Sequence, residues 1–501
     1  MERLTFNIGS SRGGPLVVAG RALGRETASK PPRPAPSPFA RATRRIAAVR
    51  ERYDWDYLWM LAFTTLLFFR PQDHIPGLQP LHLAELAAIA GLAAMAVRRL
   101  SSGQTITRVN AEVIGVVALG AIIVLTMPFS IWPGGSLTVF SEIYVKIILI
   151  FALMMSTITT PRRVRQMTWI MIIASGYIAS RAVFDYVRGV NLVEGDRVRG
   201  AIGGMFENPN DLALNLVTFL APALFIIFQE KKASRRLFAG ALAATMMAAI
   251  VCTKSRSGFL GLIGMGAVVL YYLARVKPAI VVGALLAGLM ALPVMPSSFW
   301  DRMDSIVNAD EDQTGSRAAR LRLIEQGMDV FVENPLTGIG AGQFRNYSAP
   351  DVVEKWRVTH NVWLQVATEL GLFGLLTFAF LVLRAYSSSF AALRMLRGSP
   401  KRRPQSNQQS AVRDPRSAVR HPQLDLPGDE RNILEINAKG MIAAMVGWTI
   451  CSLFASVAFN WTFYYVFALA VAGREIVASR RTAAEPAPAT VPAPRLVRAH
   501  I

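Results

Sequence analysis

The sequence predicts an all-α polytopic membrane protein with about twelve transmembrane helices. The chain of 501 residues is 52% hydrophobic and only 17% charged, and the charged residues gather between long apolar stretches. Soluble domains usually carry about 25% charged residues, and a spanning helix needs about 17–25 mainly apolar residues. The formal net charge of +21 is therefore explained more simply by a membrane protein than by nucleic-acid binding, and we expect no nucleic-acid partner.

Before the first apolar segment, residues 1–52 hold eleven Lys and Arg against three acids. They include the Pro-rich run PPRPAPSPF (31–39) and lack the apolar core of a cleavable signal peptide. This composition predicts a disordered basic cytoplasmic tail. We expect a transmembrane domain over 53–473 and a second disordered cytoplasmic tail over 474–501.

Twelve apolar segments follow the N-terminal tail, and most of them have the length of a spanning helix. The first and the last are short. The segments cover residues 55–69, 80–97, 111–132, 137–156, 164–184, 209–229, 235–252, 257–275, 278–295, 361–383, 437–458 and 460–473.

The distribution of Lys and Arg predicts the orientation of these segments. With the N-terminus inside, the inner connections and tails hold 38 of the 54 basic residues, and the outer connections hold 13. Short cytoplasmic loops are enriched in Lys and Arg, so both termini are expected in the cytoplasm. The basic inner face is also expected to attract anionic membrane lipids.

Three long connections interrupt the apolar pattern: outer loops over 185–208 and 296–359, and a polar inner loop over 384–436. Within the second outer loop, residues 316–334 have the composition and apolar spacing of a helix. The Asn334-Pro335 pair is expected to end it, and TGIGAGQF then reads as a Gly-rich turn. Long loops of this kind are usually functional or contain their own structure.

Several common kinds of site have no support in the sequence. The chain has two cysteines and five histidines, and they form neither a disulfide framework nor a spacing typical of metal ligands. It also lacks a phosphate-binding GxxxxGK[ST] loop, a dinucleotide fingerprint after a strand and a GxSxG nucleophile elbow. We therefore expect no metal, no cofactor and no ATP-driven mechanism.

His360 is the most informative histidine, because it stands where the outer loop becomes a helix. Thr359 is a candidate N-cap, and the positive end of the helix dipole favours a neutral imidazole there. A neutral imidazole can act as a general base. The alternative is a polar residue that packs at the helix end.

Outer arginines are the second group of candidates, because outer connections disfavour basic residues. Arg256 lies in a very short connection, and Arg317 and Arg320 are spaced to share one face of the predicted loop helix. Guanidinium groups match phosphate oxygens, so these residues are candidates for anion binding. Solvated or snorkelling arginines are the alternative.

Two further polar residues belong to predicted spans. Glu369 follows His360 by nine residues, and acids within the membrane are functional candidates by default. Asn210 lies in Asn208-Pro209-Asn210-Asp211, which has the composition of a helix start. That local role would be enough to explain Asn210.

The order of motifs resembles the bacterial O-antigen ligases and O-antigen polymerases. The resemblance rests on RVRGAIGGMFENPNDLA (197–213), SRSG (255–258), the arginine-bearing loop helix with NPLTGIGAGQF (334–344), and HNVWLQVATELGLFGLL (360–376). One departure is Ile324, where the family often has Trp, so Arg320 and Arg317 both remain candidates for the loop arginine.

The resemblance implies a GT-C-like glycosyltransferase of the bacterial inner membrane with its active site on the periplasmic side. It would transfer a glycan from an undecaprenyl-type polyprenyl-diphosphate carrier to a hydroxyl of lipid A core, protein or another glycan. His360 would be the catalytic base, Arg256, Arg320, Arg317 and Arg199 would bind the diphosphate, and Glu369 and Asn210 would support the site. Stabilisation of the leaving group by arginines implies a metal-independent reaction, and direct displacement implies inversion at the anomeric carbon.

Two other functions remain open at this point. A polymerase of the same family would differ only in its acceptor, and LFFRPQDHIPGLQP (67–80) resembles ligase-like proteins of exopolysaccharide or protein glycosylation systems. A transporter or flippase for lipid-linked glycans also fits twelve spans, but it would be expected to show repeats and charged features near the midplane.

Overall fold

Helices dominate the computed structural model, which describes residues 54–73, 75, 77–105, 107–193, 196–200, 206–291, 293, 300, 316–347, 358–397 and 426–484. The chain divides into two units, residues 1–54 and 55–501, and every element below belongs to the second. The predicted N-terminal tail and most of the inner loop, residues 398–425, lie outside the described residues.

Each of the twelve predicted apolar segments coincides with a helix. The helices are α2 (Trp55–Phe69), α3 (Leu83–Leu100), α4 (Ala111–Thr126), α5 (Pro133–Val139), α6 (Val145–Thr157), α7 (Pro161–Val187), α8 (Pro209–Gln229), α9 (Ala233–Thr253), α10 (Arg256–Ala274), α11 (Pro278–Ala291), α14 (Val362–Arg397), α15 (Gly428–Ser452) and α16 (Trp461–Ala484). One π-helical turn, η4 (Phe140–Tyr144), joins α5 to α6 into one continuous span.

Eight spans among the described residues are long and apolar enough to cross a membrane, and α2 and α11 are shorter apolar helices. The predicted class, an all-α polytopic membrane protein, is confirmed. The qualifying spans cover 111–129, 133–157, 161–187, 209–229, 233–253, 256–274, 362–397 and 428–452.

Side-chain caps start several of these helices where the sequence changes from loop to apolar run. Asn110, Thr160, Asn208 and Ser255 each accept a hydrogen bond from a backbone N–H in the first turn of α4, α7, α8 and α10, respectively. Such caps satisfy donors that the first turn of a helix leaves without a partner.

Two helices extend past the ends expected for their spans, and α15 begins before its expected start at 437. The inner loop was expected from 384 and the C-terminal tail from 474, but α14 continues to Arg397 and α16 to Ala484. Both extensions carry an arginine, Arg384 and Arg474, that binds the buried carboxylate of Glu112 on α4. The charge that appears to end each apolar segment is thus neutralised inside the helix bundle.

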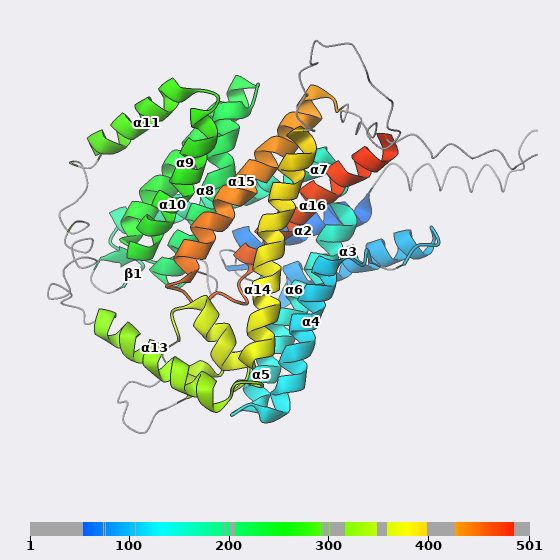
Figure 1. Cartoon of the computed structure of the whole chain (residues 1–501), viewed down its shortest axis with the longest axis vertical. Coiled ribbons are helices and arrows are strands. Elements are labelled where there is room, and N and C mark those ends of the chain that lie inside the picture. Colours follow the sequence, from blue (N-terminus) through cyan, green and yellow to red (C-terminus); the bar gives the residue numbers. More distant parts are fainter. Residues whose placement is uncertain are drawn as a thin grey trace, which may run out of the picture. The chain divides into compact units, whose positions relative to one another are not determined.

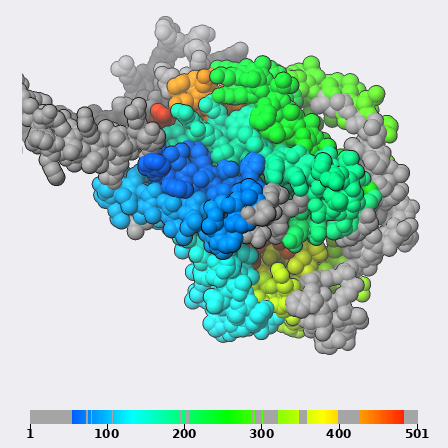
Figure 2. Space-filling model, turned by 180° about the vertical axis from the view of Figure 1, so that it is seen from behind, coloured from blue at the N-terminus to red at the C-terminus, as the bar shows by residue number. Residues whose placement is uncertain are grey.

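The helices pack around α15, which contacts α8 and α10 on one side and α14 on the other (Figure 1). On the opposite side of this unit, α2 and α3 form a continuous surface (Figure 2, blue). Close packing is visible at Gly261 of α10, where an added Cβ would lie 2.2 Å from the Sγ atom of Cys451. Small residues let spanning helices approach closely.

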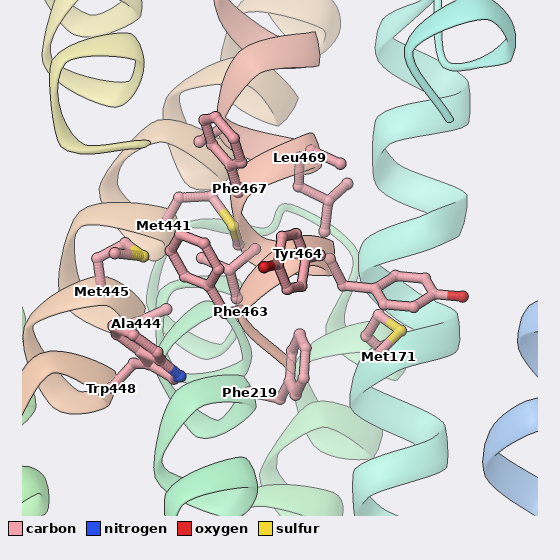
Figure 3. Packing of buried hydrophobic residues seen from close by; sticks show 14 of the residues in the cluster. Met171, Phe219, Met441, Ala444, Met445, Trp448, Phe463, Tyr464, Phe467 and Leu469 are labelled. Carbon is pink, nitrogen blue, oxygen red and sulfur yellow. The ribbon is translucent and has the colours of Figure 1, made fainter. Parts of the chain in front are cut away.

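Large side chains from α7, α8, α15 and α16 fill the centre of the bundle, as Figure 3 shows for Met171, Phe219 and Trp448. The rings of Trp448 and Phe463 lie 4.8 Å apart between centroids. This apolar centre fixes α8, α15 and α16, whose ends form part of the site described next.

Candidate functional site

An acidic cavity of about 510 Å³ opens at the end of the bundle where α8, α14 and α16 begin. We call this end the cavity end. Carboxylates, amides and hydroxyls line the cavity, together with a few apolar side chains. The lining residues are Val139, Ile143, Glu207, Asn208, Asp211, Gly342, Arg345, Val358, Thr359, His360, Gln365, Glu369, Ser456, Phe459, Asn460 and Trp461.

A second, arginine cavity of about 250 Å³ lies beside the acidic cavity. Arg256 at the start of α10 and Arg320 on the loop helix α13 (Ser316–Glu333) both line it. Thr359 and His360 line both cavities. The structure therefore brings three of the sequence-predicted site residues, His360, Arg256 and Arg320, to one place.

His360 has a left-handed backbone conformation, with φ of 48°. Its N–H donates to the Oγ of Ser456 (3.0 Å), which is also 2.9 Å from the Thr359 hydroxyl. Left-handed φ is uncommon for residues other than glycine and has a cost in energy. Contacts with the α15–α16 connection therefore hold the imidazole at the boundary between the two cavities.

The N-cap of α14 is Asn361, and the prediction of Thr359 is wrong. The Asn361 Oδ1 accepts from the N–H groups of Trp363 (2.9 Å) and Leu364 (3.1 Å). Thr359 instead bonds to Ser456 and to the carbonyl of Asn361. His360 thus precedes the cap, so its side chain is free of the capping role.

The predicted single span over 361–383 is broken at Gly371, which has φ of 66° and ψ of −163°. Only glycine adopts this region readily, and an added Cβ would lie 2.4 Å from the carbonyl oxygen of Leu336. The Leu372 N–H donates to Pro335 O (2.7 Å), outside the helix. The first two turns of α14 are therefore a separate short helix (Figure 1).

The Gly-rich turn after α13 satisfies the carbonyls that this break releases. Ile339 N–H donates to Thr368 O and Gly340 N–H to Glu369 O, both at 2.9 Å. Gly338, Gly340 and Gly342 all have positive φ. The turn GIGAGQF therefore forms part of the wall of the acidic cavity. This structural role explains its glycines, and no nucleotide-binding role is needed to explain them.

Glu369 is the last acid before the break and is buried, with 4% of its surface exposed. Its Oε2 accepts from the Gly342 N–H at 2.8 Å. Because the short helix turns back at Gly371, Glu369 lines the same cavity as His360. Its predicted supporting position agrees with this geometry.

The two candidate arginines of the loop helix are Arg317 and Arg320. The structure describes the side chain of Arg320 but not that of Arg317, although both belong to α13. Ile324, one turn after Arg320, lines the same arginine cavity. The position where the family often has Trp thus faces the cavity, which supports aligning the loop arginine with Arg320.

Arg199 and Asn210 do not line either cavity. Arg199 is exposed after the two-stranded hairpin of β1 (Leu192–Val193) and β2 (Arg197–Val198). Asn210 is buried, and its Oδ1 accepts from Arg197 Nη2 (2.8 Å) and Ser255 Oγ (2.7 Å). Asn210 therefore joins the starts of α8 and α10, while the cap of α8 is Asn208.

Arg197 and Lys254 are buried cations that sequence reasoning missed. Arg197 Nε donates to Thr253 O (3.1 Å), and the ammonium of Lys254 pairs with Asp196. Lys254 also has a left-handed backbone, with φ of 45°, directly before the cap of α10. Both fix the start of the helix that carries Arg256. The only sequence signal was their position in outer loops, which Arg199 shares.

No group of three or more His, Cys, Asp or Glu side chains in the described part of the chain is arranged to hold a metal ion. The expectation of a metal-independent reaction remains a prediction.

Comparison with known families gives one match. Residues 241–379 match the family model for O-antigen ligases, and this range contains Arg256, α13, the Gly-rich turn, His360 and Glu369. No curated protein matches the chain. The apolar helices indicate a multi-pass membrane protein, and its residues 241–379 are similar to the O-antigen ligase family.

Proposed function

We propose that the protein is a membrane glycan ligase that transfers a saccharide from a polyprenyl-diphosphate carrier to an acceptor hydroxyl at the periplasmic face. The family match supports an O-antigen ligase or polymerase type of enzyme. The observation that carries the finer proposal is the position of His360 between an arginine cavity and an acidic cavity.

The arginine cavity suits the diphosphate of the donor. Arg256 and Arg320 line it, and their guanidinium groups can donate paired hydrogen bonds to phosphate oxygens. Leu260, Leu321 and Ile324 add an apolar wall, which suits the start of a polyprenyl chain. Negative charge grows on the diphosphate as it leaves, so fixed cations there stabilise the transition state.

The acidic cavity suits the acceptor. Its carboxylates and amides can accept and donate hydrogen bonds to sugar hydroxyls, and Trp461 and Phe459 offer apolar faces. Its volume of about 510 Å³ falls in the range of small-molecule sites. Three carboxyl groups, of Glu207, Asp211 and Glu369, stand against one guanidinium group in its lining. This cavity is therefore less suited to a phosphate group than the arginine cavity, which favours the acceptor on this side.

The reaction then follows as a direct displacement. His360 takes the proton from the acceptor hydroxyl while its oxygen attacks the anomeric carbon. The bond from that carbon to the diphosphate oxygen breaks, and the polyprenyl diphosphate leaves with the electron pair. Attack opposite to the leaving group inverts the anomeric configuration. His360 afterwards returns its proton to water, and no cofactor is consumed.

A transfer assay tests this proposal. Purified protein receives a polyprenyl-diphosphate oligosaccharide with lipid A core, a protein acceptor or a glycan, and product is measured for wild type and His360→Ala. General-base catalysis contributes roughly 10²–10⁴-fold, so we expect a loss of that size. Arg322→Ala, on the exposed side of α13, is the matched control.

The same assay separates the alternatives. Transfer to a growing glycan alone would identify a polymerase. Undiminished transfer by His360→Ala would reject the site, and lipid-linked glycan transport without any transfer would favour a flippase.

A further inference from the structure

A third cavity, of about 420 Å³, lies far from His360 in sequence, between α2, α7 and α9. Three arginines line it, Arg162 and Arg165 from the first turns of α7 and Arg235 from the first turn of α9. We call it the α7 cavity. It belongs to the end of the bundle opposite to the cavity end, which we call the basic end.

Charge in the α7 cavity is poorly balanced. Arg235 pairs with Glu230 at 3.3 Å. Within the part of the chain that the structure describes, the side chains of Arg162 and Arg165 make no hydrogen bond and no ion pair. Both also lie at the positive end of the α7 dipole, where cations are unfavourable. The cavity thus gathers three guanidinium groups, of which only that of Arg235 has a direct ion pair, with Glu230.

Neighbouring cations at the basic end behave differently. Arg163, between the two, donates to Thr157 O at 2.7 Å and lies over the Tyr57 ring. Arg98 binds Asp56 at 2.7 Å. Arg162 and Arg165 therefore differ from Arg163 and Arg98, whose side chains have protein partners.

Apolar residues form the rest of the α7 cavity wall. Leu61, Trp169 and Ile170 line it, and the Trp169 ring stacks on Phe238 with centroids 5.8 Å apart. The same helices carry exposed apolar side chains, among them Leu58, one turn before Leu61 on α2, and Leu237 on α9. Trp is enriched at the level of lipid headgroups. Acyl chains can lie on this surface while the headgroup reaches the arginines.

We propose that the α7 cavity binds the phosphate group of an anionic phospholipid. Basic pockets between spanning helices recognise such headgroups, and guanidinium groups match phosphate oxygens. The site does not depend on the proposed transfer reaction, since none of its residues lines the cavities at His360.

Native mass spectrometry of the full chain in zwitterionic detergent tests this site. Phosphatidylglycerol and phosphatidylcholine are titrated onto wild type and onto Arg162→Gln/Arg165→Gln. We expect wild type to retain phosphatidylglycerol roughly tenfold more tightly than phosphatidylcholine, and the double variant to lose that preference. Arg275→Gln is the matched control, because Arg275 also lies at the basic end but stacks on Tyr271.

Three outcomes would overturn the proposal. One is equal retention of phosphatidylglycerol by wild type and the double variant. The second is an equal loss in Arg275→Gln, which would indicate general surface charge. The third is competition by millimolar inorganic phosphate, which would indicate a free-phosphate site. Thermal unfolding in phosphatidylcholine alone checks folding, and we expect no loss there because the two arginines have no protein partner to lose.

Discussion

The two ends of the helix bundle use charged residues in different ways. At the basic end, cations close helix C-termini: Arg163 binds Thr157 O, Arg236 binds Ile227 O and Arg431 binds Leu396 O, at 2.7–2.9 Å. Such contacts satisfy the last carbonyls of a helix and complement its dipole. The basic end therefore holds the helices together.

At the cavity end, polar residues stand on irregular backbone instead. His360 and Lys254 have left-handed φ, and α14 breaks at Gly371. Such conformations cost about 1–3 kcal/mol each and persist where the surroundings enforce them, often at functional sites. The difference indicates that this end keeps strained backbone in order to place His360 between its cavities.

The largest expected effect on stability comes from Gly371→Ala, which changes a residue of the irregular backbone itself. The new Cβ would meet the Leu336 carbonyl in a φ/ψ region unsuited to alanine. We expect a loss of at least about 3 kcal/mol in the free energy of unfolding. Thermal unfolding of the purified protein measures it, with Gly240→Ala as the control because a Cβ there meets nothing within 4 Å. Equal melting temperatures for the two variants would contradict the enforced break.

A second variant, Glu112→Gln, tests the charge pairing within the bundle. Glu112 is fully buried and binds both Arg384 and Arg474 at 2.7 Å. Removing one charge from such a network leaves the other charges poorly compensated, so we expect about 2–3 kcal/mol of destabilisation. Denaturant unfolding measures the change. Glu142→Gln, whose partner Lys146 also binds Glu85, is the control and should stay within about 0.5 kcal/mol.

A smaller effect is expected from Ser456→Ala, which removes the partner of the His360 N–H and of the Thr359 hydroxyl. The loss of these contacts should cost about 1–2 kcal/mol and lower the transfer rate roughly tenfold, because His360 is held less firmly. Ser479→Ala, near the end of α16, removes a local bond to Ile476 O and serves as the control. If both serine variants kept full activity, the positioning role of Ser456 would be wrong.

How far the sequence predicts this structure depends on the kind of feature. Long apolar runs predicted every helix of the membrane domain, because a spanning helix is recognised by length and composition alone. The break at Gly371 was not predicted from the sequence, because apolar residues continue on both sides of this glycine. The extensions of α14 and α16 were not predicted because an arginine normally marks the end of an apolar segment. Arg384 and Arg474 instead continue their helices, since both bind the buried carboxylate of Glu112.

Among the site residues, position in an outer connection predicted Arg256, Arg320 and His360, which the structure brings together. The same reasoning chose Arg199, which is exposed, and missed Arg197, which is buried two residues earlier. Arg197 belongs to β2 and its Nε donates to Thr253 O, whereas Arg199 follows the end of that strand. Composition does not show where so short a strand ends.

The central claim is that His360 separates a donor cavity from an acceptor cavity, and two-substrate initial-rate kinetics test it most directly. Arg320→Ala should raise the KM for the polyprenyl-diphosphate donor about tenfold and leave the acceptor KM unchanged, because it removes a charge-assisted contact to phosphate. Asp211→Asn, in the acidic cavity, should raise the acceptor KM about threefold and leave the donor KM unchanged. If both variants raised the KM of the same substrate, the two cavities would not be separate donor and acceptor sites.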